Sequence, residues 1–570
     1  MTETYADWPN CASLMFALAR RWRDRPALWA RRDGSWRATA WAEVGRQSAS
    51  LARALRARGV AAGDRVLIVS ENRPEFPIAD TAVMALRAIS VPTYTTNLPA
   101  DHAHILRDSG ARVAIVSTAS LARRVLAGAA EAGGLDLLVA MEEPGDTAGV
   151  PLLPWREAVA DAAAPDDIAA EAELIPPEQT ACLIYTSGTG GAPKGVMQPH
   201  RAIRSNCRGA FELLRPLALR DETYLSFLPL SHSYEHTCGQ FFLLSVGTQI
   251  YYSTGAERLA AEMLEVRPTV MTAVPRLFEL IRERVLAQVA RQGGWRQRLF
   301  DLALELGLRR VRGEPLGPLR LIDPLLDRLV RAKVRARFGG RLKGIMSGGA
   351  RLDPEVGRFF LALGVPVFQG YGQTEAGPVI AANPPGAIRI DTVGRVLPGV
   401  EVRIAEDGEI LVRGDLVMQG YWNNEAATRA VIDEGGWLHT GDVGALDADG
   451  YLRITDRKKD FIKTNGGEMV SPARVEGVLT QQPAIAQAVV AGDGRPHLVA
   501  LIVPAEGADE AAVTLAVETA NKMLSVPERV RRWRLVDAFT IDNGLMTPTQ
   551  KVRRPAVLAA HREVLAGLYR

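Results

Sequence analysis

Small residues gathered around one lysine form the first segment of the sequence that could do chemistry. Residues 185–196, YTSGTGGAPKGV, contain four glycines, the hydroxyl groups of Thr186, Ser187 and Thr189, and the cation of Lys194. Glycines let backbone N–H groups approach an oxyanion, hydroxyls donate hydrogen bonds to it, and a lysine adds positive charge. The segment therefore predicts a phosphate-binding loop that follows a buried strand.

The loop differs from two common phosphate-binding motifs. A Walker loop places Ser or Thr after Gly-Lys, whereas here Lys194 follows Pro193 and precedes Gly195. A dinucleotide fingerprint needs a third glycine at the place where Pro193 stands. Taken alone, the loop also fits an ordinary glycine-rich connection from a strand to a helix.

A second segment, LPLSHSYEHT, matches the H-x-x-E-H pattern of inverted zinc peptidases. In a helix, His232 and His236 would lie one turn apart and could bind zinc, with Glu235 beside them. A zinc site also needs a third ligand and a helical setting, whereas Pro229 and the two serines favour a passage from a strand to a turn. A zinc hydrolase and a polar loop with a surface histidine pair are thus two alternatives for this segment.

Five further short motifs follow the glycine-rich loop in chain order. They are SGGA at 347–350, GYGQTE at 370–375, HTGD at 439–442, DRKKDFIK at 456–463 and TPTQK at 547–551. Over nearly the whole chain, the set resembles the signature motifs of the adenylate-forming enzymes, namely acyl-CoA synthetases, peptide-synthetase adenylation domains and luciferases. The sequence departs from that family at Gly190, where Thr is usual, and at Asp456, where Gly is more frequent.

The resemblance implies ATP and Mg²⁺ as ligands. The residues that it assigns to the nucleotide are Thr186, Ser187, Gly188, Thr189, Lys194, Gly348, Gly349, Ala350, Gly370, Tyr371, Gly372, Asp442 and Arg457. Within this set, Tyr371 would stack on adenine and Asp442 would bind both ribose hydroxyls. Glu375, together with Thr189, would hold Mg²⁺, and Thr374 would meet the α-phosphate.

The same resemblance implies the catalytic lysines and the acid site. Lys551 would serve acyl-adenylate formation, and Lys463 would serve the second half-reaction. Both lie in a small C-terminal domain that would pivot at Lys459. His232 and Tyr234 would line the site of the acyl carboxylate.

The implied reaction joins a carboxylic acid to coenzyme A in two steps. Attack of the carboxylate on the α-phosphate of ATP gives an acyl-adenylate and pyrophosphate, after which a thiol displaces AMP. The segments LPLSHSYE and TAVPRLFELI and the DRKKD form of the hinge most resemble long-chain fatty acyl-CoA synthetases, which implies a fatty acid as substrate. A medium-chain or aryl acid, or an acyl-carrier protein as acceptor, remains an alternative. The apolar run at 241–247 fits either an acyl tunnel or an ordinary core helix.

The elements that must position these residues follow an α/β pattern. From Val66, apolar runs at 66–70, 91–95 and 112–117 alternate with helix-period segments, and the alternation resumes after Thr180. Such a pattern predicts parallel strands with helical crossovers, and ligands gather beyond the carboxyl ends of those strands. We therefore expect a large domain of mainly parallel sheets layered with helices.

The chain is expected to contain two domains and one insertion. Short strands with glycine-rich turns beyond Asp391 predict a small β subdomain, and a charged junction divides a domain at 1–455 from an α+β lid domain at 456–570. Within the insertion, near 291–338, two helices are predicted. Apolar residues four apart mark the second helix, namely Ile322, Leu326, Val330, Val334 and Phe338. It fits either a surface helix with a core stripe or a basic amphipathic helix on an anionic membrane.

Composition excludes several functional classes. The chain has 570 residues, of which 47% are hydrophobic, and a net charge of +3, which gives no reason to expect nucleic acid as a partner. The four cysteines form no C-x-x-C pair and favour a reducing compartment. The first residues lack a signal-peptide pattern and no apolar run of about 18 residues occurs. A cytoplasmic protein is expected, with peripheral membrane contact and a homodimer left open.

Overall fold

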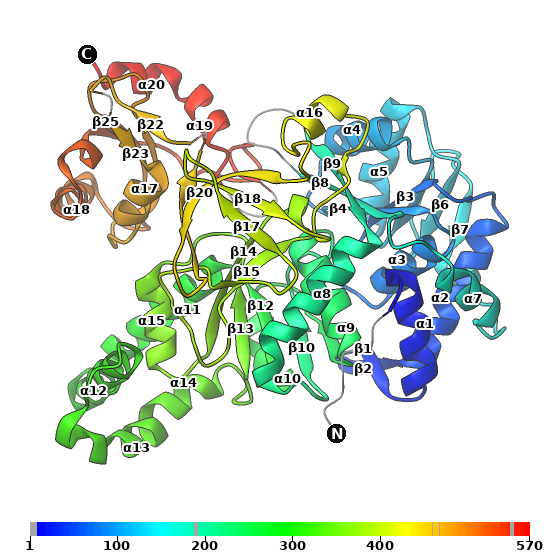
Figure 1. Ribbon diagram of the computed structural model, residues 1–570, viewed down its shortest axis with the longest axis horizontal. Helices are drawn as coiled ribbons and strands as arrows, with labels where there is room; N and C mark the ends of the chain where they lie inside the picture. The colour runs from blue at the N-terminus through cyan, green and yellow to red at the C-terminus, as the bar shows by residue number, and fades with distance from the viewer. Residues whose placement is uncertain (1–7, 187–191, 459, 467, 548–551) are drawn as a thin grey trace.

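The computed structural model describes residues 8–186, 192–458, 460–466, 468–547 and 552–570. Figure 1 shows a large N-terminal part in which helices surround two sheets, and a smaller C-terminal part beside it. No helix in the described ranges is long and apolar enough to cross a membrane.

The first sheet has eight strands in the order β19-β9-β8-β4-β3-β5-β6-β7. Its strands are β3 (Arg65–Val69), β4 (Ile89–Thr93), β5 (Val113–Val116), β6 (Leu137–Ala140), β7 (Leu152–Pro154), β8 (Thr180–Thr186), β9 (Lys194–Pro199) and β19 (Gly420–Tyr421). β3 pairs in parallel with β4 and β5, and the intervening helices are α3 (Glu75–Ala85), α4 (Pro99–Ser109) and α5 (Ala119–Ala132). These elements confirm the predicted alternation. β8 and β9, however, are antiparallel, so the glycine-rich loop joins two strands and not a strand and a helix.

The second sheet has nine strands in the order β16-β15-β14-β13-β12-β10-β11-β1-β2. Its strands are β1 (Pro26–Arg32), β2 (Ser35–Ala40), β10 (Thr223–Ser226), β11 (Gln249–Tyr252), β12 (Val270–Ala273), β13 (Gly344–Ser347), β14 (Val367–Gly372), β15 (Val379–Ala382) and β16 (Arg395–Val396). The central strands β10 to β14 are parallel, as predicted, and antiparallel strands close both edges. The SGGA and GYGQTE motifs therefore lie where β13 and β14 end.

Apolar side chains pack between the two sheets and fix the position of one sheet relative to the other. One buried cluster contains Val66 of β3, Ile184 of β8 and Ile250 of β11, together with Phe241 of the π-helix η2 (Glu235–Phe242). The same cluster takes in the helices α1 (Cys11–Trp22) and α2 (Trp41–Arg56), and α8 (His200–Leu214) packs against η2. Because this core fixes η2 between the sheets, it also fixes the residues that η2 presents to the site.

Two smaller units complete the chain. As predicted, an antiparallel sheet follows the second large sheet, formed by β17 (Glu401–Ile404), β18 (Glu409–Arg413), β20 (Leu438–Leu446) and β21 (Leu452–Arg457). The C-terminal unit contains β22 (Ile462–Lys463), β23 (Met469–Val470), α17 (Pro472–Thr480), β24 (Ile485–Ala491), β25 (Leu498–Pro504), α18 (Glu510–Lys522), β26 (Val530–Leu535), α19 (Arg554–Ala560) and α20 (Arg562–Gly567). β24 and β25 form the expected hairpin. The division at 455/456 falls within β21 and stays a prediction.

The insertion is helical, as predicted, but its second helix is composite. The predicted range begins at the end of α11 (Pro275–Gln292) and contains α12 (Gly294–Val311), η3 (Gly317–Leu321), α13 (Asp323–Leu326), η4 (Asp327–Arg331) and α14 (Ala332–Ala336). Leu326, Val330, Val334 and Phe338 are buried, which confirms the core stripe at these positions. Ile322 is 38% exposed, so its assignment to that stripe was wrong: the segment is a 3-10 turn up to Leu321 and a helix only from Asp323.

Candidate active site

A cavity of about 1140 Å³ lies where the two large sheets, the small β sheet and the C-terminal unit meet. It is bordered by the ends of β8 and β14, by the turn after β13 and by β20. The predicted residues that line it are Thr186, Lys194, His232, Tyr234, Gly348, Gly349, Gly370, Tyr371, Gly372, Thr374, Glu375 and Arg457. Segments far apart in the sequence thus converge on one space.

Lys194 stands at the start of β9, directly opposite Thr186 of β8. Its ammonium group lies 4.8 Å from the centroid of the Tyr421 ring, where a cation is attracted to the aromatic face. The Tyr421 hydroxyl donates a hydrogen bond of 2.9 Å to Glu375 Oε1. Burial and the adjacent Glu375 raise the pKa of Tyr421, so the phenol stays a donor. The other loop residues assigned to phosphate, Ser187, Gly188 and Thr189, lie outside the described residues.

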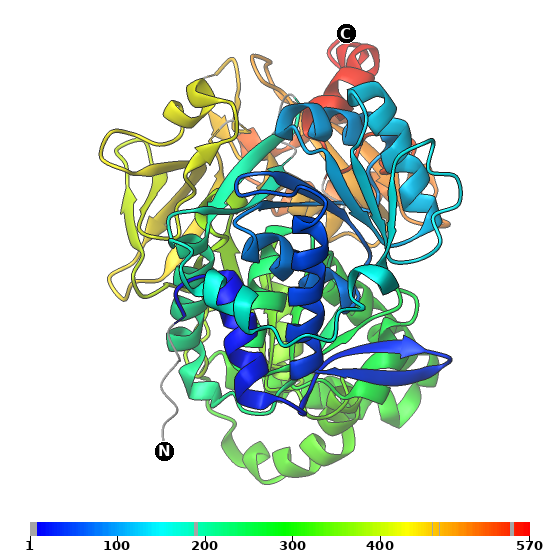
Figure 2. The same cartoon turned by 90° about the vertical axis from the view of Figure 1, so that its right-hand side faces the viewer.

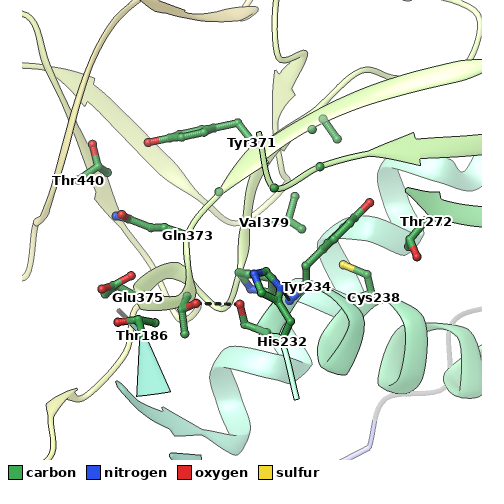
Figure 3. Close-up of a pocket in the computed structure, with 18 of the residues that line it drawn as sticks. Thr186, His232, Tyr234, Cys238, Thr272, Tyr371, Gln373, Glu375, Val379 and Thr440 are labelled. Carbon is green, nitrogen blue, oxygen red and sulfur yellow. Dashed lines mark hydrogen bonds between the residues drawn. The ribbon is translucent and has the colours of Figure 1, made fainter. Parts of the chain in front are cut away.

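Thr374 and Glu375 form a short turn, η5 (Thr374–Ala376), directly after β14. Thr374 Oγ1 is 2.9 Å from Ser233 Oγ, which ties this turn to the segment that carries His232 and Tyr234. Figure 3 shows Glu375 and Thr186 close together at one side of the cavity. Carboxylate and hydroxyl oxygens suit Mg²⁺, which is usually bound through one or two carboxylates and substrate phosphates.

Tyr371, Asp442 and Arg457 are joined at the end of the cavity that faces the small β sheet. The Tyr371 hydroxyl donates a hydrogen bond of 2.6 Å to Asp442 Oδ2, and Arg457 Nε lies 3.4 Å from Asp442 Oδ1. β20 and β21 place Asp442 and Arg457 opposite each other. Burial and the nearby Asp442 raise the pKa of Tyr371 well above its ordinary value. Asp442 itself does not line the cavity, but it is bonded to Tyr371 and Arg457, which do. The HTGD motif alone did not reveal this connection.

The glycines of the two motifs permit close approaches. A Cβ atom on Gly348 would lie 2.9 Å from the Tyr234 ring, and one on Gly372 would lie 1.8 Å from the Pro378 carbonyl oxygen. The Tyr234 hydroxyl donates a hydrogen bond of 2.9 Å to the Met346 carbonyl oxygen. The SGGA motif thus seats the tyrosine assigned to the acid. Ala350 is not among the residues that line the cavity, and its assignment to the nucleotide stays a prediction.

The three residues of the H-x-x-E-H pattern point to different places. His232 lines the cavity, whereas His236 Nε2 lies 2.9 Å from Asp80 Oδ2 in the core, where both side chains are fully buried. The segment is helical from Ser233 onward, contrary to the predicted turn. The described residues contain no cluster of three or more His, Cys, Asp or Glu that could hold a metal ion. The surface-histidine alternative is therefore wrong, because His236 is buried, and nothing in the described part of the chain supports the zinc-hydrolase alternative.

Glu235 is a fully buried carboxylate behind the cavity wall. Its oxygens accept hydrogen bonds from Tyr224 (2.6 and 2.7 Å), Ser226 (2.6 Å) and Thr272 (2.7 Å). Desolvation raises its pKa to about 7, although the three hydroxyl donors act in the opposite direction. Tyr224 and Thr272 also line the cavity, so the carboxylate fastens β10 and β12 to η2 at that wall. The sequence had suggested Glu235 only as part of a zinc site.

A large share of the cavity lining is apolar, and this apolar part is called the arm below. Its lining is mostly aliphatic and comprises Ala210, Leu213, Leu214, Leu217, Leu219, Phe242, Leu243, Val270, Met271, Met346, Phe368, Val379, Ala382 and Leu397. Of the run at 241–247 proposed for an acyl tunnel, Phe242 and Leu243 line the arm, whereas Phe241 packs edge-on against His236 in the core. The residues from α8 and the turn after it were not predicted, because aliphatic residues at helical spacing look like ordinary core.

The C-terminal unit contributes residues on both sides of 548–551. Thr547 and Val552 line the cavity, and so does Arg554, whose guanidinium binds both Glu476 oxygens at 2.5 and 2.6 Å. Lys551 and Lys459 themselves lie outside the described residues. Lys463 is exposed at β22 and does not line the cavity; its backbone N–H donates to Asp493 Oδ1.

This fold and this site define an adenylate-forming enzyme, in which one cavity offers polar groups for a nucleotide and an apolar arm beside them. The sequence matches the family model of the AMP-binding enzymes over residues 15–422 and that of their C-terminal domain over residues 459–570. The chain belongs to the AMP-binding enzyme family.

Curated relatives and solved structures agree with this family. A Mycobacterium tuberculosis protein named long-chain-fatty-acid--CoA ligase FadD15 is 34% identical, with 99% of this chain and 98% of the relative covered. Long chain acyl-CoA synthetase 6, peroxisomal, of Arabidopsis thaliana is 30% identical over 94% of this chain and 82% of its own length. The crystal structure of the anthranilate CoA ligase AuaEII with anthranoyl-AMP has the same fold, with a TM-score of 0.76, 23% identity, and coverage of 98% and 99%.

Proposed function

We propose that this protein is an ATP-dependent, AMP-forming ligase that converts a fatty acid, of the long-chain class, into its coenzyme A thioester. The observation that carries the proposal is one cavity whose lining combines Lys194, Glu375 and Tyr371 with many aliphatic side chains. ATP fits the polar end and an acyl chain fits the arm. The names of the relatives support coenzyme A as acceptor and a long-chain acid as substrate.

In the first step, a carboxylate oxygen of the acid bonds to the α-phosphorus of ATP while the bond to pyrophosphate breaks. The two anions repel each other, so the enzyme must align them and neutralise charge. Lys194 and Lys551 would supply positive charge, and Thr374 would donate to the α-phosphate. Asp442 would accept hydrogen bonds from the ribose hydroxyls. Bound Mg²⁺, held by Glu375 and Thr189, would neutralise the phosphates.

In the second step, the coenzyme A thiol attacks the acyl carbon and AMP leaves. We assign Lys463 to this step and propose that the unit from 456 onward acts as a lid that pivots at Lys459 between the steps. In the present arrangement the residues beside Lys551 line the cavity, whereas Lys463 is exposed elsewhere. This arrangement suits the first step and supports a rotation before the second.

A product screen tests the proposed reaction. Saturated acids from C2 to C18 and benzoate would be supplied with ATP and Mg²⁺, with and without coenzyme A, and pyrophosphate, AMP and thioester would be measured. We expect AMP, pyrophosphate and acyl-CoA in equal amounts, with the highest kcat/KM for long chains. Release of ADP would overturn the proposal. A preference for benzoate would replace the acid class, and turnover only with an acyl-carrier protein would replace the acceptor.

A further inference from the structure

A stripe of aliphatic side chains faces outward from the second half of the insertion. Leu321, Leu325 and Leu329 are 86%, 56% and 40% exposed, and Ile322 beside them is 38% exposed. Leu325 and Leu329 lie four apart in the helical segment that begins at Asp323 and so share one side of it, and Leu321 and Ile322 directly precede that segment; we call these exposed residues the row. Single exposed leucines are common on protein surfaces, whereas a row of large apolar residues marks a surface that another body covers.

The row lies on a different side of the segment from the residues that are packed against the protein. Leu326 and Val330, the next residues along the chain, are buried in the core cluster that includes Phe300 of α12. The segment therefore has two apolar sides, one of which already has its partner. Figures 1 and 2 both show the insertion at an outer end of the molecule, and the exposed leucines lie on it.

Positive charge is concentrated around this row. Residues 291–341 contain thirteen Arg and Lys residues and five Asp and Glu residues, an excess of eight, whereas the whole chain has an excess of three. Several of these arginines are used internally, for example Arg331 with Asp323 at 2.8 Å and Arg335 with Asp327 at 2.8 Å. Arg320 and Arg328, which directly precede Leu321 and Leu329, are exposed and make no ion pair within the described ranges.

Cations beside exposed leucines suit the surface of an anionic bilayer. Leucine side chains insert into the boundary between headgroups and acyl chains, while the guanidinium groups bind lipid phosphates. The row at 321, 325 and 329 continues four residues further into the exposed Lys333, so it ends in another cation. A second copy of the chain is a poor occupant, because a symmetric contact would bring the same cations against each other.

We propose that the face of residues 317–333 that carries Leu321, Ile322, Leu325 and Leu329 docks on an anionic lipid bilayer. The use of this contact rests on the proposed function, because a fatty acid partitions into bilayers and docking would bring the ligase to its substrate. The binding itself needs neither ATP nor turnover. The two proposals can therefore fail separately.

Vesicle sedimentation with the full-length protein tests the docking. Vesicles of phosphatidylcholine alone are compared with vesicles that contain phosphatidylglycerol as the anionic lipid. We expect at least tenfold tighter binding to the anionic vesicles, weakening as salt is raised, because surface charge attraction is screened. Equal binding to both vesicle types, or binding to neither, would overturn the proposal.

Two double variants and one single control variant separate the contributions of the leucines and of the arginines to vesicle binding. Leu321→Ser with Leu325→Ser should lower binding to anionic vesicles at least tenfold, and Arg320→Glu with Arg328→Glu should lower it similarly and remove most of the salt dependence. The matched control is Leu515→Ser, which changes a 64% exposed leucine on α18 of the C-terminal unit and should bind as the parent does. The thermal midpoint of each variant shows that it is folded. Membrane docking would be overturned if both the leucine and the arginine double variants bound vesicles as the parent does. It would also be overturned if light scattering showed the parent as a dimer and these variants as monomers.

Discussion

At one end of the cavity, Tyr371, Asp442 and Arg457 are joined by a hydrogen bond of 2.6 Å and an ion pair, whereas at the other end the wall consists of aliphatic side chains from α8 and the turn after it. At the polar end, the position of each charged group is fixed by a specific hydrogen-bond or ion-pair partner. The apolar end is defined only by its shape. The buried carboxylate of Glu235 lies behind the cavity wall and accepts hydrogen bonds from Tyr224 and Thr272, which line the cavity.

This difference predicts different tolerances at the two ends. A site built to form hydrogen bonds rejects a ligand that lacks the matching group by large factors, because buried polar atoms are then left unpaired. A hydrophobic pocket distinguishes one methylene by only about 1–3 kcal/mol. We therefore expect strict selection of the nucleotide and graded selection of the acid. The following experiments test that contrast.

The largest effect is expected for Lys551→Ala. A cation about 4 Å from the reacting phosphate is worth roughly 4 kcal/mol at an effective dielectric constant near 20, so acyl-adenylate formation should fall about 1000-fold. Thiolysis of supplied acyl-adenylate should be nearly unchanged. Pyrophosphate release measures the first step, and acyl-CoA formation from synthetic acyl-adenylate measures the second.

Lys463→Ala is the matched control for this experiment, because it changes a lysine of the same unit that is assigned to the other step. It should slow thiolysis and leave pyrophosphate release largely intact. Equal losses in both steps for either variant would contradict the division of labour between the two lysines.

The next effect concerns stability and the pH dependence of Glu235. In the folded protein its pKa is about 7, against an ordinary value of 4.5, so the unfolded chain loses this proton first as the pH rises. The parent protein should therefore lose up to about 3 kcal/mol of unfolding free energy between pH 4.5 and pH 7, and Glu235→Gln should lack that loss. Urea unfolding at pH 5 and pH 8, followed by tryptophan fluorescence, measures the difference between parent and variant.

Ser226→Ala gives the opposite test at the same site. This variant removes a hydroxyl that donates 2.6 Å from a Glu235 oxygen and so raises the pKa of the carboxylate further. Its unfolding free energy should fall more steeply toward pH 8 than that of the parent. A Glu235→Gln variant whose stability relative to the parent is the same at both pH values would show that the carboxylate does not titrate in this window.

The sequence predicted the polar end of the cavity better than the apolar end, for a physical reason. The motifs GYGQTE and HTGD, through their resemblance to a family, pointed to Tyr371 and Asp442; the structure places Tyr371 in the cavity lining and Asp442 within hydrogen-bond distance of it. Leu213 and Leu217 could not be recognised in the same way, because an aliphatic residue that faces a cavity and one that faces a core have the same type and spacing. Apolar runs predicted the strands correctly because a buried strand is continuously apolar. The same residue type gave no sign that part of the apolar surface lines a cavity.

Two further differences show where local pattern fails. Pro229 and the serines near His232 predicted a turn, yet the segment is helical from Ser233 because it packs between the two sheets, and Glu235 is fixed there by partners from β10 and β12. In the insertion, the stripe ending at Phe338 was found, but the outward row at Leu321, Leu325 and Leu329 was not. A helical period shows that a side is apolar, and only the fold shows whether that side is covered.

A smaller effect is expected at the ribose side of the polar end. Asp442→Asn keeps the size of the side chain but removes the charge that faces Arg457 and accepts from Tyr371, so KM for ATP should rise about 30-fold, equivalent to roughly 2 kcal/mol. Tyr371→Phe, which keeps the ring and removes only the hydroxyl, should raise this KM less. KM for the acid should stay within about twofold in both variants. A larger change in KM for the acid than in KM for ATP would contradict the assignment of this end to the nucleotide.

The smallest effect is expected in the apolar arm, at Leu213. Leu213→Trp adds bulk to a wall that selects only by shape. It should displace the last few methylenes of a long acid and leave a short acid unaffected. At about 0.8 kcal/mol per methylene, the ratio of kcat/KM for C16 over that for C8 should fall about tenfold. Arg208→Trp is the control, because it adds the same side chain at an exposed position of α8 that does not line the cavity, and its ratio should match the parent. If Leu213→Trp lowered kcat/KM equally for both acids, the added bulk would be acting on the shared carboxylate site, and the arm would not be where chain length is measured.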